Sequence, residues 1–152
     1  MIELLRTTTE NKDFLNLIPL LDAELKISDG DNHSFYDQFN KLDTIKNVVV
    51  AYENKKPIGC GAFKFHKNKT VEIKRMFVSP LGRRKGIASK VLNELELWAK
   101  ELGYTKCILE TGKQQPEAIE LYKKSGYAIT PNFGFYENVE NSVCFEKNLR
   151  TS

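Results

Sequence analysis

The chain has 152 residues, of which 41% are hydrophobic and 28% charged, and its formal net charge is +3. These values are typical of one globular domain with one core, so we predict a single domain over residues 1–152. The small net charge argues against a nucleic-acid-binding protein, and the polar N-terminus and short apolar runs indicate neither a secretion signal nor a membrane span, so we expect a cytoplasmic protein.

The first half of the chain changes repeatedly between strand and helix patterns. Ile2–Arg6 predicts a short strand, and apolar residues at helical spacing from Phe14 to Leu25 predict an amphipathic helix. A shorter helix is expected over Phe35–Lys41. Three strands follow, over Val48–Glu53, Ile58–His66 and Val71–Val78, with hairpin turns at 54–57 and 67–69. These three strands are predicted to form an antiparallel meander.

The second half predicts the remaining helices and strands. A strongly amphipathic helix begins near Ile87 and stops at Gly103. A buried strand over Cys107–Leu109 precedes another helix over Glu117–Ser125, with Pro116 in its first turn. Two strands, Tyr127–Thr130 and Val143–Leu149, come last. The predicted fold is a mixed α/β domain of order β-α-α-β-β-β-α-β-α-β-β, with a mostly antiparallel sheet of about seven strands and helices on both faces.

The three cysteines lie far apart in the sequence, at Cys60, Cys107 and Cys144, and each stands in an apolar run. We therefore expect buried, reduced thiols and no disulfide. The chain has two histidines, and neither has cysteine or histidine neighbours at the spacing of a zinc cluster, so no metal site is expected.

A loop rich in glycine and basic residues connects the predicted third meander strand to the long helix. The N–H groups at a helix N-terminus are unpaired, and the helix dipole favours an anion there. Gly82 and Gly86 permit a close approach of the backbone to such an anion. Neither the Walker pattern nor the Gly-x-Gly-x-x-Gly dinucleotide pattern is present. The loop therefore predicts an anion site of another kind, to which three side chains add positive charge: Arg83, Arg84 and Lys85.

The spacing Arg83-x-x-Gly86-x-Ala88 resembles the Arg/Gln-x-x-Gly-x-Gly/Ala signature of the GNAT acetyltransferase superfamily, which binds the pyrophosphate of acetyl-CoA. Two other segments fit the same family. The segment Glu72-Ile73-Lys74-Arg75-Met76-Phe77-Val78-Ser79-Pro80 resembles its fourth strand, and Ala118-x-x-Leu121-Tyr122-x-x-x-Gly126-Tyr127 resembles its helix-to-strand cofactor motif. With the order of the elements, the resemblance covers nearly the whole chain. It implies a stand-alone N-acetyltransferase with acetyl-CoA as co-substrate.

The resemblance also implies which residues contact the cofactor. Backbone groups of Met76, Phe77 and Val78 would pair with the pantetheine arm like an added strand. The amide groups of Arg84, Lys85, Gly86, Ile87 and Ala88 would hold the pyrophosphate. The side chain of Arg83 or Arg84 would bind the outer phosphates, including the ribose 3′-phosphate. Ala118 belongs to the second cofactor motif, and Gln115 stands where family members often carry an asparagine that binds the pantetheine.

Glu72 is the first candidate for the general base, since attack on a thioester requires a neutral amine and therefore a proton acceptor or a water chain. It lies eleven positions before Arg83, the spacing from which some family members supply a catalytic glutamate. Strand alternation would place Glu72 on the face of Lys74, Met76 and Val78, unless a bulge intervenes. The alternative is that Glu72 is a solvent-facing partner of Lys64, Lys74 or another sheet cation.

Glu110 and Tyr122 complete the candidate catalytic residues. Glu110 ends the next strand, at the position where substrate sites of open α/β sheets gather, and is the second candidate base. Tyr122 matches the family tyrosine that points at the cofactor sulfur, and a protonated phenol can donate to the leaving thiolate. The alternative for Tyr122 is that it only packs against its own helix face and the core.

The acceptor is expected to be an amine of a small molecule or of a protein. In the family, the first helices and the last hairpin form the acceptor side. Acidic and aromatic groups there suit a cationic amine, although such groups are more often simply those of a solvated loop. The other interpretation of the chain is a catalytically silent acyl-CoA sensor or partner subunit. No nucleic acid or membrane partner is expected, and a homodimer is allowed. The acceptor-side residues are Glu24, Asp29, Asp31, His33, Tyr36, Asp37, Phe39 and Asn132–Glu137.

Overall fold

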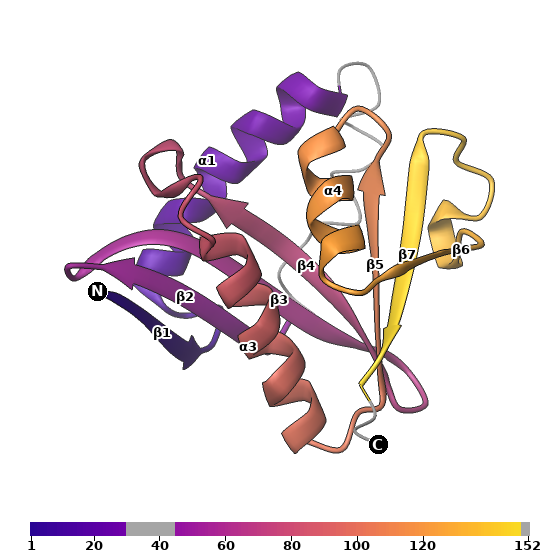
Figure 1. The fold of residues 1–152 in the computed structure, drawn as a ribbon, viewed down its shortest axis with the longest axis horizontal. Coiled ribbons are helices and arrows are strands. Elements are labelled where there is room, and N and C mark those ends of the chain that lie inside the picture. Colours follow the sequence, from indigo (N-terminus) through magenta and orange to yellow (C-terminus); the bar gives the residue numbers. More distant parts are fainter. Residues whose placement is uncertain (30–44, 150–152) are drawn as a thin grey trace.

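The computed structural model describes residues 1–29 and 45–149. Helices and strands alternate along this part of the chain much as the sequence predicts (Figure 1). The second predicted helix, Phe35–Lys41, lies outside the described residues. The elements are β1 (Ile2–Thr7), α1 (Lys12–Asp29), β2 (Asn47–Glu53), β3 (Lys56–Lys67), β4 (Thr70–Val78), η2 (Pro80–Gly82), α3 (Ile87–Glu101), β5 (Lys106–Gly112), α4 (Pro116–Lys124), β6 (Ala128–Thr130), η3 (Gly134–Tyr136) and β7 (Ser142–Asn148).

One seven-stranded sheet runs through the molecule in the order β1-β2-β3-β4-β5-β7-β6. All its neighbours are antiparallel except β4 and β5, which pair in parallel only from Thr70–Lys106 to Glu72–Ile108. Beyond that point the two strands diverge (Figure 1). The sheet therefore opens between the C-terminal parts of β4 and β5, and this opening positions the candidate site.

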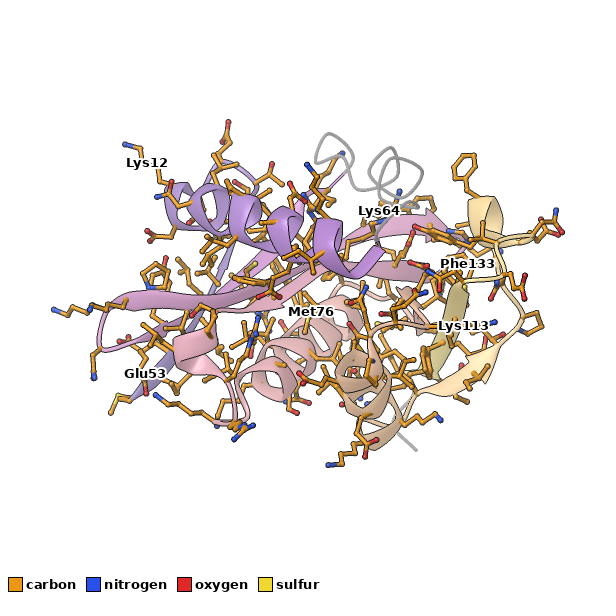
Figure 2. The ribbon with its side chains drawn as sticks, turned by 90° about the horizontal axis from the view of Figure 1, so that it is seen from above. Lys12, Glu53, Lys64, Met76, Lys113 and Phe133 are labelled. Atoms are coloured by element: carbon orange, nitrogen blue, oxygen red, sulfur yellow. The ribbon has the colours of Figure 1, made fainter. Side chains whose placement is uncertain are left out.

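The helices cover both faces of the sheet, as predicted. Figure 2 shows α1 on one side and α3 and α4 on the other. Strand β2 is buried on both faces, since Val48 and Val50 belong to the core cluster under α1, and Val49 and Ala51 to the cluster under α3. The alternation of side chains along a strand sends successive residues into different layers, which is why this strand is almost continuously apolar.

The two meander turns are tight and are confirmed close to their predicted positions. Asn54 and Lys55 have φ of 51° and 69°, the left-handed values that a two-residue hairpin turn requires at both central positions. In the second turn, Asn68 has φ of 52°. Asparagine adopts this region more readily than most residues, so the local sequence specifies where both turns occur.

A β-bulge interrupts β4 at Arg75. Cys60 of β3 pairs with Phe77 of β4, and Ala62 of β3 pairs with Lys74 of β4. Between these two pairs β4 has one residue more than β3, which is the extra residue of the bulge. Arg75 has φ of 58°, in the left-handed region.

This bulge changes which side chains share a face of β4. Glu72 and Lys74 line a cavity with residues of α1, whereas Met76 and Val78 pack against the core cluster under α3. A shared face for Glu72, Met76 and Val78 is predicted only for a strand without a bulge, and the bulge is the exception that applies: the extra residue shifts the alternation by one position, so Glu72 does not share a face with Met76 and Val78. The shared face of Glu72 and Lys74, which precede the bulge, is confirmed.

Gly61 makes room for the bulge on the neighbouring strand. A Cβ atom at Gly61 would lie 2.5 Å from Met76 Sδ, 2.8 Å from Val91 Cγ1 and 2.9 Å from Leu95 Cδ1. These distances are far shorter than van der Waals contact, so a side chain here would displace Met76 and residues of α3. The missing side chain at Gly61 thus lets Met76 pack inward after the bulge.

Candidate active site

A long groove opens where β4 and β5 diverge. Its volume is about 780 Å³, and it extends from the loop before α3 to the first turns of α4. Every residue that the sequence assigns to the cofactor lines this groove, with the exception of Lys85. These residues are Met76, Phe77, Val78, Arg83, Arg84, Gly86, Ile87, Ala88, Gln115 and Ala118. The fold therefore brings together three segments that are separate in the sequence.

The loop between β4 and α3 exposes the N-terminus of α3 to the groove. Arg84 and Gly86 have φ of 65° and 74°, so the chain turns sharply just before the helix. No side chain of a described residue caps this end of α3. A Cβ atom at Gly86 would meet no atom within 4 Å, which shows open space in front of the helix. The N–H groups of the first turn can therefore bind an anion.

The three basic side chains of the loop differ in their partners. Arg83 donates from Nε to the last carbonyl of β4 at 2.9 Å and forms an ion pair with Glu24 of α1. Lys85 Nζ lies 2.9 Å from Glu53 Oε1, and Lys85 does not line the groove. The Arg84 side chain has no hydrogen bond or ion pair with the described part of the chain. Arg84 is thus the basic group that can engage a phosphate without breaking an existing contact.

A smaller cavity of about 110 Å³ adjoins the groove. Helices α1 and α4, strands β4 and β5, and the short helix η3 contribute its walls. Both predicted carboxylates line it, together with two basic residues, Lys74 and Arg75, and the phenol of Tyr136. Six residues line both spaces and so mark their junction: Leu21, Leu25, Met76, Gln115, Ala118 and Tyr122.

Tyr122 stands at this junction. Only 6% of the residue is exposed, and its ring centroid lies 5.9 Å from that of Tyr127 and 5.8 Å from that of Phe145. Its hydroxyl makes no hydrogen bond to a described residue. Burial, and next the charge of Glu110, raises the pKa of the Tyr122 phenol above its ordinary value of 10.0. Tyr122 therefore packs in the core and also presents a protonated phenol to the junction.

Glu72 is buried, with 5% of the residue exposed, so the solvent-facing part of the alternative is wrong, whereas the pairing with Lys74 that it named is observed. Its Oε2 lies 3.5 Å from Lys74 Nζ, which also donates a hydrogen bond to the hydroxyl of Tyr136 at 3.4 Å. Burial lowers the pKa of Lys74, and the charge of Glu72 opposes that shift. Glu72 is thus the buried ion-pair partner of Lys74 within the small cavity.

Glu110 lies on β5, across the opening from Glu72. It is half-buried, and its Oε2 accepts a hydrogen bond of 2.6 Å from the Ser142 hydroxyl on β7. Its charge is the second cause of the raised pKa of Tyr122, which places the carboxylate within electrostatic range of that phenol. The structure therefore brings Glu110 and Tyr122, which the sequence proposed separately, to the same cavity.

The predicted acceptor side is only partly within the described residues. Glu24 lines the groove and Tyr136 lines the small cavity, whereas Phe133 packs between the rings of His66 and Tyr136 at centroid distances of 5.5 and 5.8 Å. The side chain of Asp29 and the whole of Asp31, His33, Tyr36, Asp37 and Phe39 lie outside the described residues.

Sequence reasoning missed Lys74 and Arg75 as members of the cavity. Lysine and arginine are rarely buried, so nothing in the local pattern singled out these two. Leu21 and Leu25, which belong to the predicted apolar positions of the amphipathic helix α1, also line the cavity.

Comparisons with known proteins agree with this geometry. The family model for the acetyltransferase (GNAT) family matches residues 14–127. The chain belongs to the GNAT family of acetyltransferases. Among curated relatives, IAA acetyltransferase of Azospirillum brasilense is 36% identical over 102 residues, which are 66% of this chain and 67% of that protein. The predicted membership, and with it acyltransferase activity, is confirmed.

Solved structures of GNAT proteins have the same fold. A protein of Klebsiella pneumoniae described as an acyl-CoA N-acyltransferase aligns with a TM-score of 0.82 at 28% identity, over 99% of both chains. A GNAT family acetyltransferase from Elizabethkingia anophelis with acetyl-CoA bound aligns with a TM-score of 0.71 at 21% identity, over 97% of both chains. The predicted mixed sheet and its flanking helices are those of this family, and the strand order observed in the sheet is consistent with it.

Three further findings concern the described residues alone. No group of three or more His, Cys, Asp and Glu side chains within them is arranged to hold a metal ion. None of the helices within residues 1–29 and 45–149 is long and apolar enough to cross a membrane. Cys60, Cys107 and Cys144 are buried and free, as expected.

Proposed function

We propose that this GNAT protein is an N-acetyltransferase that transfers the acetyl group of acetyl-CoA directly to an amine within a ternary complex. The observation that carries the proposal is the junction at Tyr122, where a long groove with a phosphate-type loop meets a small cavity with carboxylates. The groove takes the cofactor and the cavity takes the amine. The thioester then lies at the junction, within reach of both.

The pyrophosphate binds the N-terminus of α3 in this proposal. Free N–H groups, the helix dipole and the open space in front of Gly86 support it. Arg84 binds an outer phosphate, because its guanidinium has no partner to give up among the described residues. Lys85 contributes its backbone amide, since its side chain pairs with Glu53.

The pantetheine arm lies along β4. Pairing with β5 ends at Glu72, so the backbone beyond it, from Ile73 to Val78, has no strand of the described chain beside it on that edge. An extended ligand can add to such an edge by main-chain hydrogen bonds. Gln115 and Ala118 of the opposite wall line the same stretch of the groove.

Acetyl transfer then needs one base and one acid. The amine nitrogen attacks the thioester carbon, its proton passes to a carboxylate, the C–S bond breaks, and the thiolate takes a proton from the Tyr122 hydroxyl. Glu110 is the better base, because Ser142 orients its carboxylate at 2.6 Å and its charge acts on Tyr122. Glu72 is engaged by Lys74 at 3.5 Å and keeps that lysine in place.

Single substitutions separate the two carboxylates. Glu110→Gln should lower kcat by about 10²-fold or more, as loss of a general base does, while Glu72→Gln should have a smaller effect at unchanged CoA affinity. Equal and large losses in both variants would contradict the assignment of the base to Glu110. A bound water chain would be the acceptor if neither variant lost activity.

Turnover tests the proposal as a whole. CoA should raise the melting temperature in a concentration-dependent way, because it binds only the folded protein. Incubation with acetyl-CoA and a panel of amines should release free CoA, detected with a thiol reagent. Stabilisation by CoA without release in the presence of any amine would instead support the sensor or partner-subunit interpretation.

A further inference from the structure

Arg75 is an unusual residue in the wall of the small cavity. It occupies the bulge of β4 with φ of 58°, and only 5% of its side chain is exposed. Arginine is almost never this deeply buried unless its charge and its donors are matched by partners. The bulge places Arg75 where β4 faces α1, next to the cavity that the proposed amine enters.

The guanidinium group of Arg75 is matched in charge but not in hydrogen bonds. Its Nη1 lies 3.0 Å from Asp22 Oδ1 on α1, an ion pair whose direction is not that of a hydrogen bond. Nε and Nη1 are shielded from solvent and have no hydrogen-bond partner. The third nitrogen, Nη2, differs from these two because it is not shielded from solvent. It makes no hydrogen bond to the described chain, so it is the nitrogen that a ligand can reach.

The reachable Nη2 group of a buried guanidinium is suited to an anion. A carboxylate accepts charge-assisted hydrogen bonds from its N–H groups, and such bonds are strong when little water competes. Glu110 stands on β5, on the other side of the opening, and carries a negative charge. Lys74 and Glu72, which also line the cavity from β4, pair with each other at 3.5 Å. Arg75 on β4 and Glu110 on β5 are therefore the cation and the anion on the two sides of the opening.

We infer that the acceptor of this enzyme is a small amine that also carries a carboxylate, such as a free amino acid, and that Arg75 binds that carboxylate. The inference rests on the proposed function, since it assigns the small cavity to the acceptor. The amine of the acceptor faces Glu110 and the thioester, and its carboxylate lies against Arg75. The volume of about 110 Å³ suits a small molecule of this kind and excludes a folded protein substrate from the cavity itself.

A purely structural role is the competing explanation. In that case Arg75 only ties the bulge to α1 through Asp22, and loss of either partner should have the same effect. Asp22 does not line the cavity, so Asp22→Asn is a matched control that removes the ion pair while leaving the guanidinium. Arg75→Gln removes the charge and the guanidinium but keeps a polar, though shorter, side chain that can still donate hydrogen bonds.

The test compares amino acids with their own amides, for example L-leucine with L-leucinamide, across a panel of side chains. The wild-type protein should acetylate at least one amino acid with a kcat/KM about tenfold or more above that of its amide, the advantage of hydrogen bonds to a charged group. Arg75→Gln should remove this preference mainly through KM and leave the amide rate and CoA affinity unchanged. Asp22→Asn should retain the preference.

Three results would overturn the inference. In the first, the wild-type protein acetylates amides or decarboxylated amines with the same kcat/KM as the amino acids. In the second, Arg75→Gln and Asp22→Asn lower the rates with all acceptors to the same extent, as expected if Arg75 has only a structural role. CoA could bind while no amino acid is acetylated, which leaves the cofactor assignment standing. If CoA did not bind at all, the proposed function itself would fail. Thermal melts of each variant with and without CoA show whether CoA binds, and so distinguish failure of the proposed function from failure of this inference.

Discussion

Arg83 and Glu24 form an ion pair across the cofactor groove, between the loop before α3 and helix α1. Both side chains are partly exposed, at 42% and 43%, so the pair itself adds little to stability. It does, however, place a carboxylate beside the predicted phosphate site. A CoA phosphate that uses Arg83 must compete with Glu24.

We therefore expect Glu24→Gln to bind CoA more tightly, by up to about fivefold, since an exposed ion pair is worth at most about 1 kcal/mol. Isothermal titration with CoA at low salt measures the change, and added salt should reduce it. Glu53→Gln is the matched control, because it releases Lys85, which does not line the groove, and should leave affinity unchanged. Weaker binding by Glu24→Gln would mean that Glu24 positions Arg83 for the phosphate.

Gly86→Val should raise the Kd for CoA by about tenfold or more, because the valine side chain would fill the space in front of the α3 N-terminus. The positive φ of 74° also costs the variant stability, roughly 2 kcal/mol. Gly103→Val is the control, since Gly103 has φ of 94°, open space around it, and a place at the other end of α3. Both variants should melt at lower temperature, but only Gly86→Val should lose CoA. Normal CoA affinity in folded Gly86→Val would remove the loop from the site.

Tyr122→Phe should lower kcat by about 10²-fold while CoA affinity stays similar, because it removes the proton donor and keeps the ring packing against Tyr127 and Phe145. The hydroxyl has no hydrogen bond to a described residue, so its loss should barely change the melting temperature. The measurement needs a pre-steady-state burst experiment to exclude limiting product release. An undiminished kcat would return Tyr122 to a packing role, with water as the proton source.

Ionisation of Tyr122 should cause no fall in kcat below about pH 10. Burial raises the pKa of this phenol, so the protonated, donating form persists to higher pH than in a free tyrosine. Initial rates measured from pH 6 to 10, corrected for thioester hydrolysis, should rise and then remain level. A fall below about pH 9 that is present in the wild type and absent in Tyr122→Phe would show that the tyrosine ionises early.

Much of this fold follows from local patterns in the sequence. Strand-like runs between turn signals predicted the strands of the meander, and Asn54 and Asn68 marked turns that need left-handed φ. The loop from Arg83 to Ala88 could be predicted as an anion site, because every helix N-terminus has free N–H groups, whatever packs around it. The residues of the opposite wall of the groove are not specified by this local pattern.

The bulge at Arg75 could not be predicted in the same way. It depends on a non-local match, since Gly61 on β3 provides the space into which Met76 turns. Strand alternation alone therefore placed Glu72 on the wrong side of the sheet relative to Met76. The burial of Lys74 and Arg75 was missed for a related reason, because their counter-charges, Glu72 and Asp22, are met only after β4 packs against α1.

Direct transfer of acetyl from acetyl-CoA to an amine is the central claim, and product analysis with the purified protein tests it most directly. Labelled acetyl-CoA and the amino acid panel should give an N-acetylated product in a one-to-one ratio with released CoA. Initial rates at varied concentrations of both substrates should give intersecting lines, as a ternary complex requires. Release of CoA without acetylated amine, or parallel lines with an isolable acetylated protein, would contradict the account.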